Sequence, residues 1–191
     1  MRGMFPWGGF GANPMPDFLT RYWTEWGDRI LGGFPYSEGL YDDLNKAIMA
    51  RLYWDGAPPK ETIREYAAYH FGPQTADPVL EAVALLEAHQ LRTWENGDFV
   101  FPHTRLRMPA NQGARRALDL LEDAEKFLFT ACFRDTWRWR ILKLRAEIDV
   151  ELFAADGAIS PACEAAFETL TALYHADRAD FAVHPPTRNV R

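Results

Sequence analysis

The sequence has only two cysteines and no long apolar run. Cys132 and Cys163 are too few and too far apart to form a disulfide framework, so we expect both to be small buried apolar side chains in a reducing compartment. No stretch reaches the roughly 18 apolar residues of a membrane span, and the N-terminus lacks an apolar signal core. We therefore expect no membrane partner and a cytoplasmic location.

Positive charge is also scarce. The chain has 21 Lys and Arg residues against 27 Asp and Glu residues, which gives a formal net charge of −6 at pH 7, and it contains no long basic run. Binding to a nucleic-acid backbone depends on clustered positive charge. We therefore do not expect nucleic acid as a partner.

Motifs that hold metals or cofactors are missing as well. The sequence has no H-E-x-x-H pair, no G-x-S-x-G nucleophile elbow and no G-x-x-x-x-G-K-[ST] phosphate loop. Its five histidines are scattered, and two isolated cysteines cannot form a structural zinc site by themselves. We therefore predict no metal and no cofactor.

Apolar and aromatic side chains are abundant and recur at helical spacing. Hydrophobic residues make up 48% of the chain and aromatic residues 14%, enough to fill a sizeable core. The spacing predicts a mainly α fold, an irregular bundle of about six helices with a further short helix at the start. The helical runs are residues 17–26, 41–54, 59–71, 78–91, 111–130, 134–155 and 160–175.

Several single residues carry local predictions within these helices. Asp17 is expected to cap the first helix and Ser160, followed by Pro161, to cap the last. Trp54, at the end of its helix, is expected to pack against the protein. The basic and aromatic run 134–140 could stack on a base or a sugar, but helical spacing favours Trp137 as a core anchor beside solvated or ion-paired arginines.

Two segments predict β-structure. The apolar run at 29–36, interrupted by paired glycines, predicts a buried strand. The Asn96-Gly97 pair predicts either a small β-hairpin near residues 93–101 or an ordered loop. The chain is thus divided into an aromatic, glycine-rich N-terminal segment with the strand (1–40), a helical domain (41–185) and a flexible tail (186–191).

A polar cluster follows the predicted strand. A carboxylate at the end of a strand can accept hydrogen bonds from sugar hydroxyls or take part in proton transfer. The same groups could instead satisfy the N-terminal N–H groups of the next helix, with Asp42 and Asp43 interacting favourably with its dipole. No catalytic residue is assigned. The candidate substrate-binding residues are Tyr36, Ser37, Glu38, Asp42 and Asn45.

The run G-G-F-P-Y-S-E-G-L-Y-D-D-L-N-K at residues 32–46, with segments 52–55, 63–66 and 137–149, resembles the last barrel strand and the helical C-terminal domain of hexosaminidase-like (β/α)8 glycoside-hydrolase-like proteins. Many of these carry a domain of unknown function. The resemblance spans about residues 15–185 and implies a carbohydrate-related function, with Glu38 at the rim of a sugar site. A complete barrel needs about 250 residues, so most of it is missing here.

Three functions fit these features. The first is a helical C-terminal module of a glycoside-hydrolase-like protein that binds carbohydrate and is not catalytically complete alone. Either the chain is a C-terminal piece of a longer ancestor, or a separate partner chain supplies the missing barrel. The second is a non-enzymatic helical interaction module, or a homo-oligomer, that docks through its Phe/Trp-rich N-terminal segment. The third is a small enzyme that uses Glu38 with Asp42.

Overall fold

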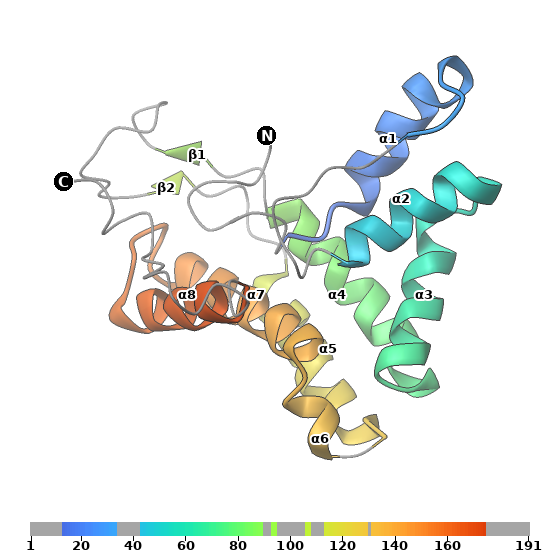
Figure 1. Ribbon diagram of the computed structural model, residues 1–191. Coiled ribbons are helices and arrows are strands. Elements are labelled where there is room, and N and C mark those ends of the chain that lie inside the picture. The colour runs from blue at the N-terminus through green and yellow to red at the C-terminus, as the bar shows by residue number, and fades with distance from the viewer. Residues whose placement is uncertain are drawn as a thin grey trace.

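The computed structural model describes residues 13–33, 43–89, 93–94, 106–107, 113–129 and 131–174 (Figure 1). Within these ranges the chain forms eight α-helices and one two-stranded sheet, which confirms the predicted mainly α fold. The helices are α1 (Pro16–Trp26), α2 (Asp43–Asp55), α3 (Pro59–His70), α4 (Ala76–His89), α5 (Ala114–Ala124), α6 (Ala131–Arg134), α7 (Trp137–Ala154) and α8 (Pro161–Tyr174).

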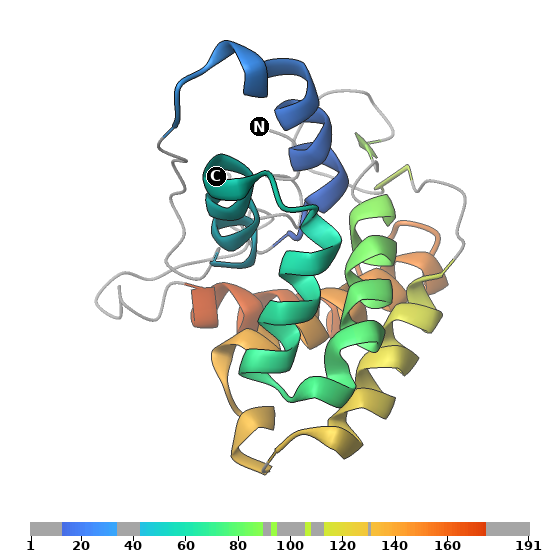
Figure 2. The same ribbon diagram turned by 90° about the vertical axis from the view of Figure 1, so that its right-hand side faces the viewer.

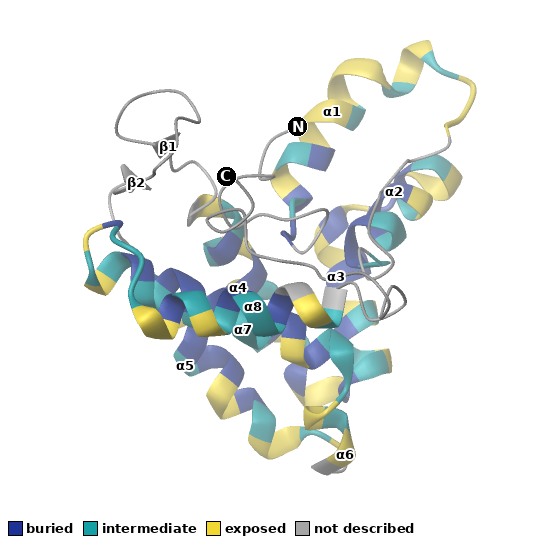
Figure 3. Cartoon of the chain, turned by 60° about the vertical axis from the view of Figure 1, so that its left-hand side comes forward, coloured by how far each residue is buried: buried dark blue, intermediate teal, exposed yellow. Residues whose placement is uncertain are grey.

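Two apolar clusters form the core, and both include α7. The larger cluster packs the buried faces of α1 to α5 against one side of α7, where the fully buried Trp139 meets Phe71 at 5.0 Å between ring centroids. The second cluster packs Ile141 and Ile148 of α7 against Phe167 of α8. Figure 2 shows α3, α4 and α5 side by side, and Figure 3 shows that α1 is exposed along most of its length.

The small sheet joins β1, Thr93–Trp94, to β2, Leu106–Arg107, in an antiparallel pair with Trp94 opposite Leu106. The first strand lies where the small hairpin was predicted, but its partner strand, at residues 106–107, lies outside the predicted range 93–101. A two-residue turn at Asn96-Gly97 would have placed Trp94 opposite residue 99. The second strand lies beyond residue 101, so that turn does not set the register.

The buried strand predicted over residues 29–36 is wrong in its described part. A short 3-10 turn covers Gly27–Arg29, and no strand is formed over residues 30–33. Leu31 is fully exposed instead of buried. A lone strand that is buried without a neighbour would leave its N–H and C=O groups unpaired, whereas exposure lets water satisfy them. Residues 34–36 lie outside the described residues.

Ser160 caps α8 as predicted. Its Oγ accepts a hydrogen bond from the Cys163 N–H at 3.0 Å and donates one to Glu151 Oε2 at 2.7 Å. The hydroxyl therefore satisfies an N–H of the first turn of α8 and also ties this turn to α7.

Asp17 is not the N-cap of α1, because the helix already begins at Pro16. The N–H groups of Asp17 and Phe18 donate instead to the two carboxylate oxygens of Glu87 on α4, at 2.7 and 2.8 Å. Burial raises the pKa of Glu87, although the two backbone hydrogen bonds favour its ionised form. Glu87, which is distant in the sequence, therefore accepts the hydrogen bonds at the start of α1 that the Asp17 side chain was predicted to accept.

Three side-chain environments differ from the predictions. Trp54 is 88% exposed, since it lies about 200° around α2 from the buried Leu52. Cys163 is buried as expected, but Cys132 is exposed. Trp137 is half-buried against the second cluster, and the deeper anchor of α7 is Trp139.

No helix in the described ranges is both long enough and apolar enough to cross a membrane.

Candidate functional site

Asn45 is the only predicted binding residue within the described part of the chain. Tyr36, Ser37, Glu38 and Asp42 lie outside it. Asn45 is buried on α2, where its amide nitrogen donates to the Asn13 carbonyl at 2.7 Å and its amide oxygen accepts from the Met15 N–H at 3.0 Å. These two bonds fasten the chain that leads into α1 onto α2.

Asp43, the first residue of α2, directly follows Asp42 in the sequence and lies in a polar cluster built from three helices. The Tyr66 hydroxyl on α3 donates to Asp43 Oδ1 at 2.9 Å. Arg138 Nε on α7 donates to Asp43 Oδ2 at 2.6 Å. We call Asp43, Tyr66, His70 and Arg138 the Asp43 cluster. The side chains of Asp43 and Arg138 are 26% and 31% exposed, so solvent reaches this ion pair.

Packing fixes the members of the Asp43 cluster in place. Tyr66 and His70 lie one turn apart on α3, and their ring centroids are 4.4 Å apart. Tyr66 also meets the fully buried Phe71 edge-on at 6.0 Å. The Arg138 guanidinium lies 4.0 Å from the centroid of the Trp137 ring. The ion pair of Arg138 confirms the prediction that arginines in this run are solvated or paired.

Burial and charge set the protonation of the cluster. Burial, with Asp43 nearby, raises the pKa of Tyr66 above its ordinary range, so its hydroxyl stays a donor. Burial, and then the Arg138 charge, lowers the pKa of His70 against the opposing effect of Asp43. Because His70 has the lower pKa in the folded chain, the free energy of unfolding decreases as the pH falls below about 6.5, where the unfolded chain binds the proton first.

The Asp43 cluster presents both donors and acceptors to a ligand. A carboxylate has about four acceptor sites, and the two bonds just described use two of those of Asp43. A guanidinium has five N–H donors, and the bond to Asp43 uses one of those of Arg138. Within the described residues His70 makes no side-chain hydrogen bond, and its neutral imidazole carries one donor and one acceptor. Sugar hydroxyls also donate and accept, so this arrangement suits a polyhydroxylated ligand.

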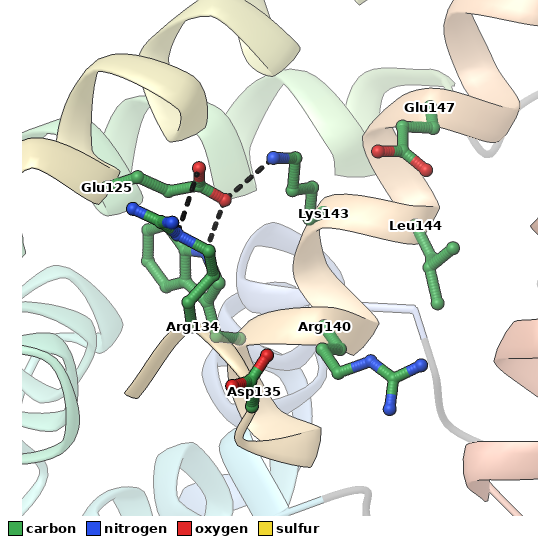
Figure 4. Close-up of a pocket in the computed structure, with 8 residues that line it drawn as sticks. Glu125, Arg134, Asp135, Arg140, Lys143, Leu144 and Glu147 are labelled. Carbon is green, nitrogen blue, oxygen red and sulfur yellow. Dashed lines mark hydrogen bonds and ion pairs between the residues drawn. The ribbon is translucent and has the colours of Figure 1, made fainter. Parts of the chain in front are cut away.

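A second charged cluster surrounds Glu125, beside a cavity of about 250 Å³ (Figure 4). Glu125 Oε1 accepts from Trp139 Nε1 at 3.1 Å and from Lys143 Nζ at 2.7 Å, and Oε2 lies 3.5 Å from Arg134 Nε. Burial opposes ionisation, but these donors together lower the pKa of Glu125. Figure 4 shows Arg140 directed away from Glu125. The charged groups that converge are bonded to one another, so we assign this cluster the role of joining the end of α5 to α7.

Neither cluster offers a metal site. Within the described ranges no group of three His, Cys, Asp or Glu side chains is placed to hold a metal ion. The Asp43 cluster contains a single carboxylate and one imidazole.

Comparison with known proteins identifies no relative. No protein-family model matches the chain, and no curated protein or solved structure matches it significantly. The resemblance to glycoside-hydrolase-like proteins therefore stays a prediction that rests on the residues alone.

Tyr66, His70 and Arg138 are not among the predicted binding residues, although Arg138 belongs to the run 134–140 that could stack on a base or a sugar. The available signal was the pair of polar rings one turn apart on the apolar face of α3, which also carries Ile63 and Ala67. No local pattern indicates that Arg138 pairs with Asp43, because the two residues are 95 positions apart in the sequence.

Proposed function

We propose that this chain is the helical C-terminal module of a glycoside-hydrolase-like protein, and that the Asp43 cluster and the adjoining residues 36–42 bind carbohydrate. One observation carries the proposal. Asp43 directly follows the predicted binding residues, and it is held by Tyr66 from α3 and Arg138 from α7.

Glu38 and Asp42 are close to Asp43 in the sequence. Glu38 is five residues from Asp43, and five residues span at most about 18 Å even when fully extended. Asp42 is the immediate neighbour of Asp43, so their Cα atoms are about 3.8 Å apart. In this proposal the carboxylates of Glu38 and Asp42 contact the same ligand as Asp43 and Arg138.

The module supplies binding and not a complete hydrolytic site. Glycoside cleavage needs two carboxyl groups that face one bond, one to protonate the leaving group and one to act as base or nucleophile. In the described part of the chain Asp43 is the only carboxylate of the cluster, and it is ion-paired with Arg138. The catalytic groups would come from a barrel that residues 1–191 do not include.

Isothermal titration calorimetry of the full chain with chitohexaose, cellohexaose and xylohexaose tests this function. We expect saturable binding of at least one hexasaccharide. Replacing Glu38 by Gln should weaken that binding about tenfold or more, because a charge-assisted hydrogen bond is lost, and should leave the melting temperature unchanged.

The matched control is Glu25→Gln on the exposed face of α1, which should bind like the wild type. Absence of binding to all three hexasaccharides would overturn the proposal. So would equal affinities of the wild type and Glu38→Gln.

A further inference from the structure

A chain of four aromatic rings connects the buried core to the surface at the end of α3. Phe71 is fully buried and meets Tyr66 edge-on. Tyr66 contacts His70 at 4.4 Å, and His70 contacts Tyr69 at 4.9 Å with the ring planes 85° apart. The chain thus passes from the core through the Asp43 cluster and ends in a side chain that is 80% exposed.

Tyr69 combines a ring contact with high exposure. The edge-on contact with His70 restrains its ring, while most of the ring surface remains in water. A restrained and exposed aromatic ring is a ready stacking surface, since it loses little conformational entropy when a ligand covers it. The apolar face of a pyranose ring is a partner of matching size and character for such a surface.

Further aromatic side chains flank the same end of α3. The Phe129 ring lies close to Gly72, where a Cβ atom would be 3.7 Å from it, and Phe129 is 59% exposed. Phe133 lies 5.9 Å from Phe129 between ring centroids. Figure 2 shows the C-terminal end of α3 beside the segment between α5 and α6. Two further aromatic side chains therefore lie near the end of α3 that carries Tyr69.

We propose that Tyr69 forms a second sugar subsite beside the Asp43 cluster, so that the ligand is an oligosaccharide whose neighbouring residue stacks on the Tyr69 ring. This inference rests on the proposed carbohydrate function. One sugar unit is held by hydrogen bonds at the Asp43 cluster, and the next is held by its apolar face at Tyr69. Stacking on Tyr69 favours ligands of more than one sugar unit, and hydrogen bonding at the Asp43 cluster favours ligands that carry hydroxyl groups.

The test compares Tyr69→Ala with the wild type in calorimetric titrations of the hexasaccharide that the wild type binds and of the matching disaccharide: chitobiose, cellobiose or xylobiose. We expect Tyr69→Ala to weaken hexasaccharide binding about tenfold, in line with the loss of one aromatic stacking contact, and to change disaccharide binding much less. Tyr69→Phe keeps the ring and should bind like the wild type.

Trp54→Ala is the matched control. Trp54 is an exposed aromatic side chain at the end of α2, and its removal should leave binding unchanged. Wild-type affinity of Tyr69→Ala for the hexasaccharide, or an equal loss for both sugars, would overturn the second subsite while leaving the proposed function intact. Absence of any binding by the wild type would instead overturn the proposed function, and this inference with it.

Discussion

Replacing Asp149 by alanine should lower the free energy of unfolding by about 3–5 kcal/mol, since it breaks a buried ion pair with Arg145. Arg145 Nη2 lies 3.5 Å from Asp149 Oδ1 on α7, and both side chains are fully buried. Equilibrium urea unfolding measures the loss. The double variant Arg145→Met, Asp149→Leu removes both charges and should recover much of it.

The exposed pair Arg115–Asp119 provides a control with the same spacing of four residues on a helix. Solvent screens this pair, so Asp119→Ala should change stability very little. If Asp149→Ala and Asp119→Ala unfolded at the same urea concentration, the buried pair would not be a structural element of α7.

Replacing Trp139 by alanine should cost a similar amount, about 3–5 kcal/mol, because it empties a fully enclosed site in the larger cluster. The Trp139 ring packs edge-on against Phe71, and its indole N–H donates to Glu125. Trp139→Phe keeps most of the volume but loses the donor, so we expect a smaller loss of about 1–2 kcal/mol.

The free energies of unfolding of the Trp139 variants, from thermal and urea unfolding, should be compared with that of Trp54→Ala. Trp54 is 88% exposed, and its removal should stay within about 0.5 kcal/mol of the wild type. A Trp139→Ala variant as stable as Trp54→Ala would contradict the assignment of Trp139 as the anchor between α7 and the core.

The fold was predictable because its helices carry local signals. Apolar spacing and turn residues place α3 and α8 within one or two residues of their observed bounds, and the cap of Ser160 is formed as predicted. Local signals failed where a contact bridges distant segments. The carboxylate that binds the start of α1 belongs to Glu87, 70 residues from Asp17, and nothing near Asp17 indicates it.

The choice of Trp137 over Trp139 as core anchor failed for a different reason. Helix α7 is buried on two faces, one against the larger cluster and one against α8. Helical spacing that assumes one apolar face on α7 selects Trp137, Ile141 and Ile148, which contact α8. It does not detect the second face, which packs Trp139 against the larger cluster. A helix shared by two clusters does not show one apolar stripe, so its deepest residue cannot be identified from spacing.

The candidate site was predictable only in part. Polar residues crowded before α2 predicted a site in that region, and Asp43, at its described edge, lies in a polar cluster with Tyr66 and Arg138. Tyr66, His70 and Arg138 reach Asp43 only because α3 and α7 pack beside the start of α2. Their roles depend on tertiary packing, which residue spacing along one helix does not encode.

The most direct test of the account is an NMR titration of the His70 imidazole with and without a saturating hexasaccharide, with the signal assigned through a His70→Gln variant. We expect a His70 pKa below the ordinary 6.5 in the free chain, and a change in both the chemical shift and the pKa when the sugar covers the Asp43 cluster. A bound hexasaccharide that leaves the His70 titration unchanged would place the sugar elsewhere and contradict the account.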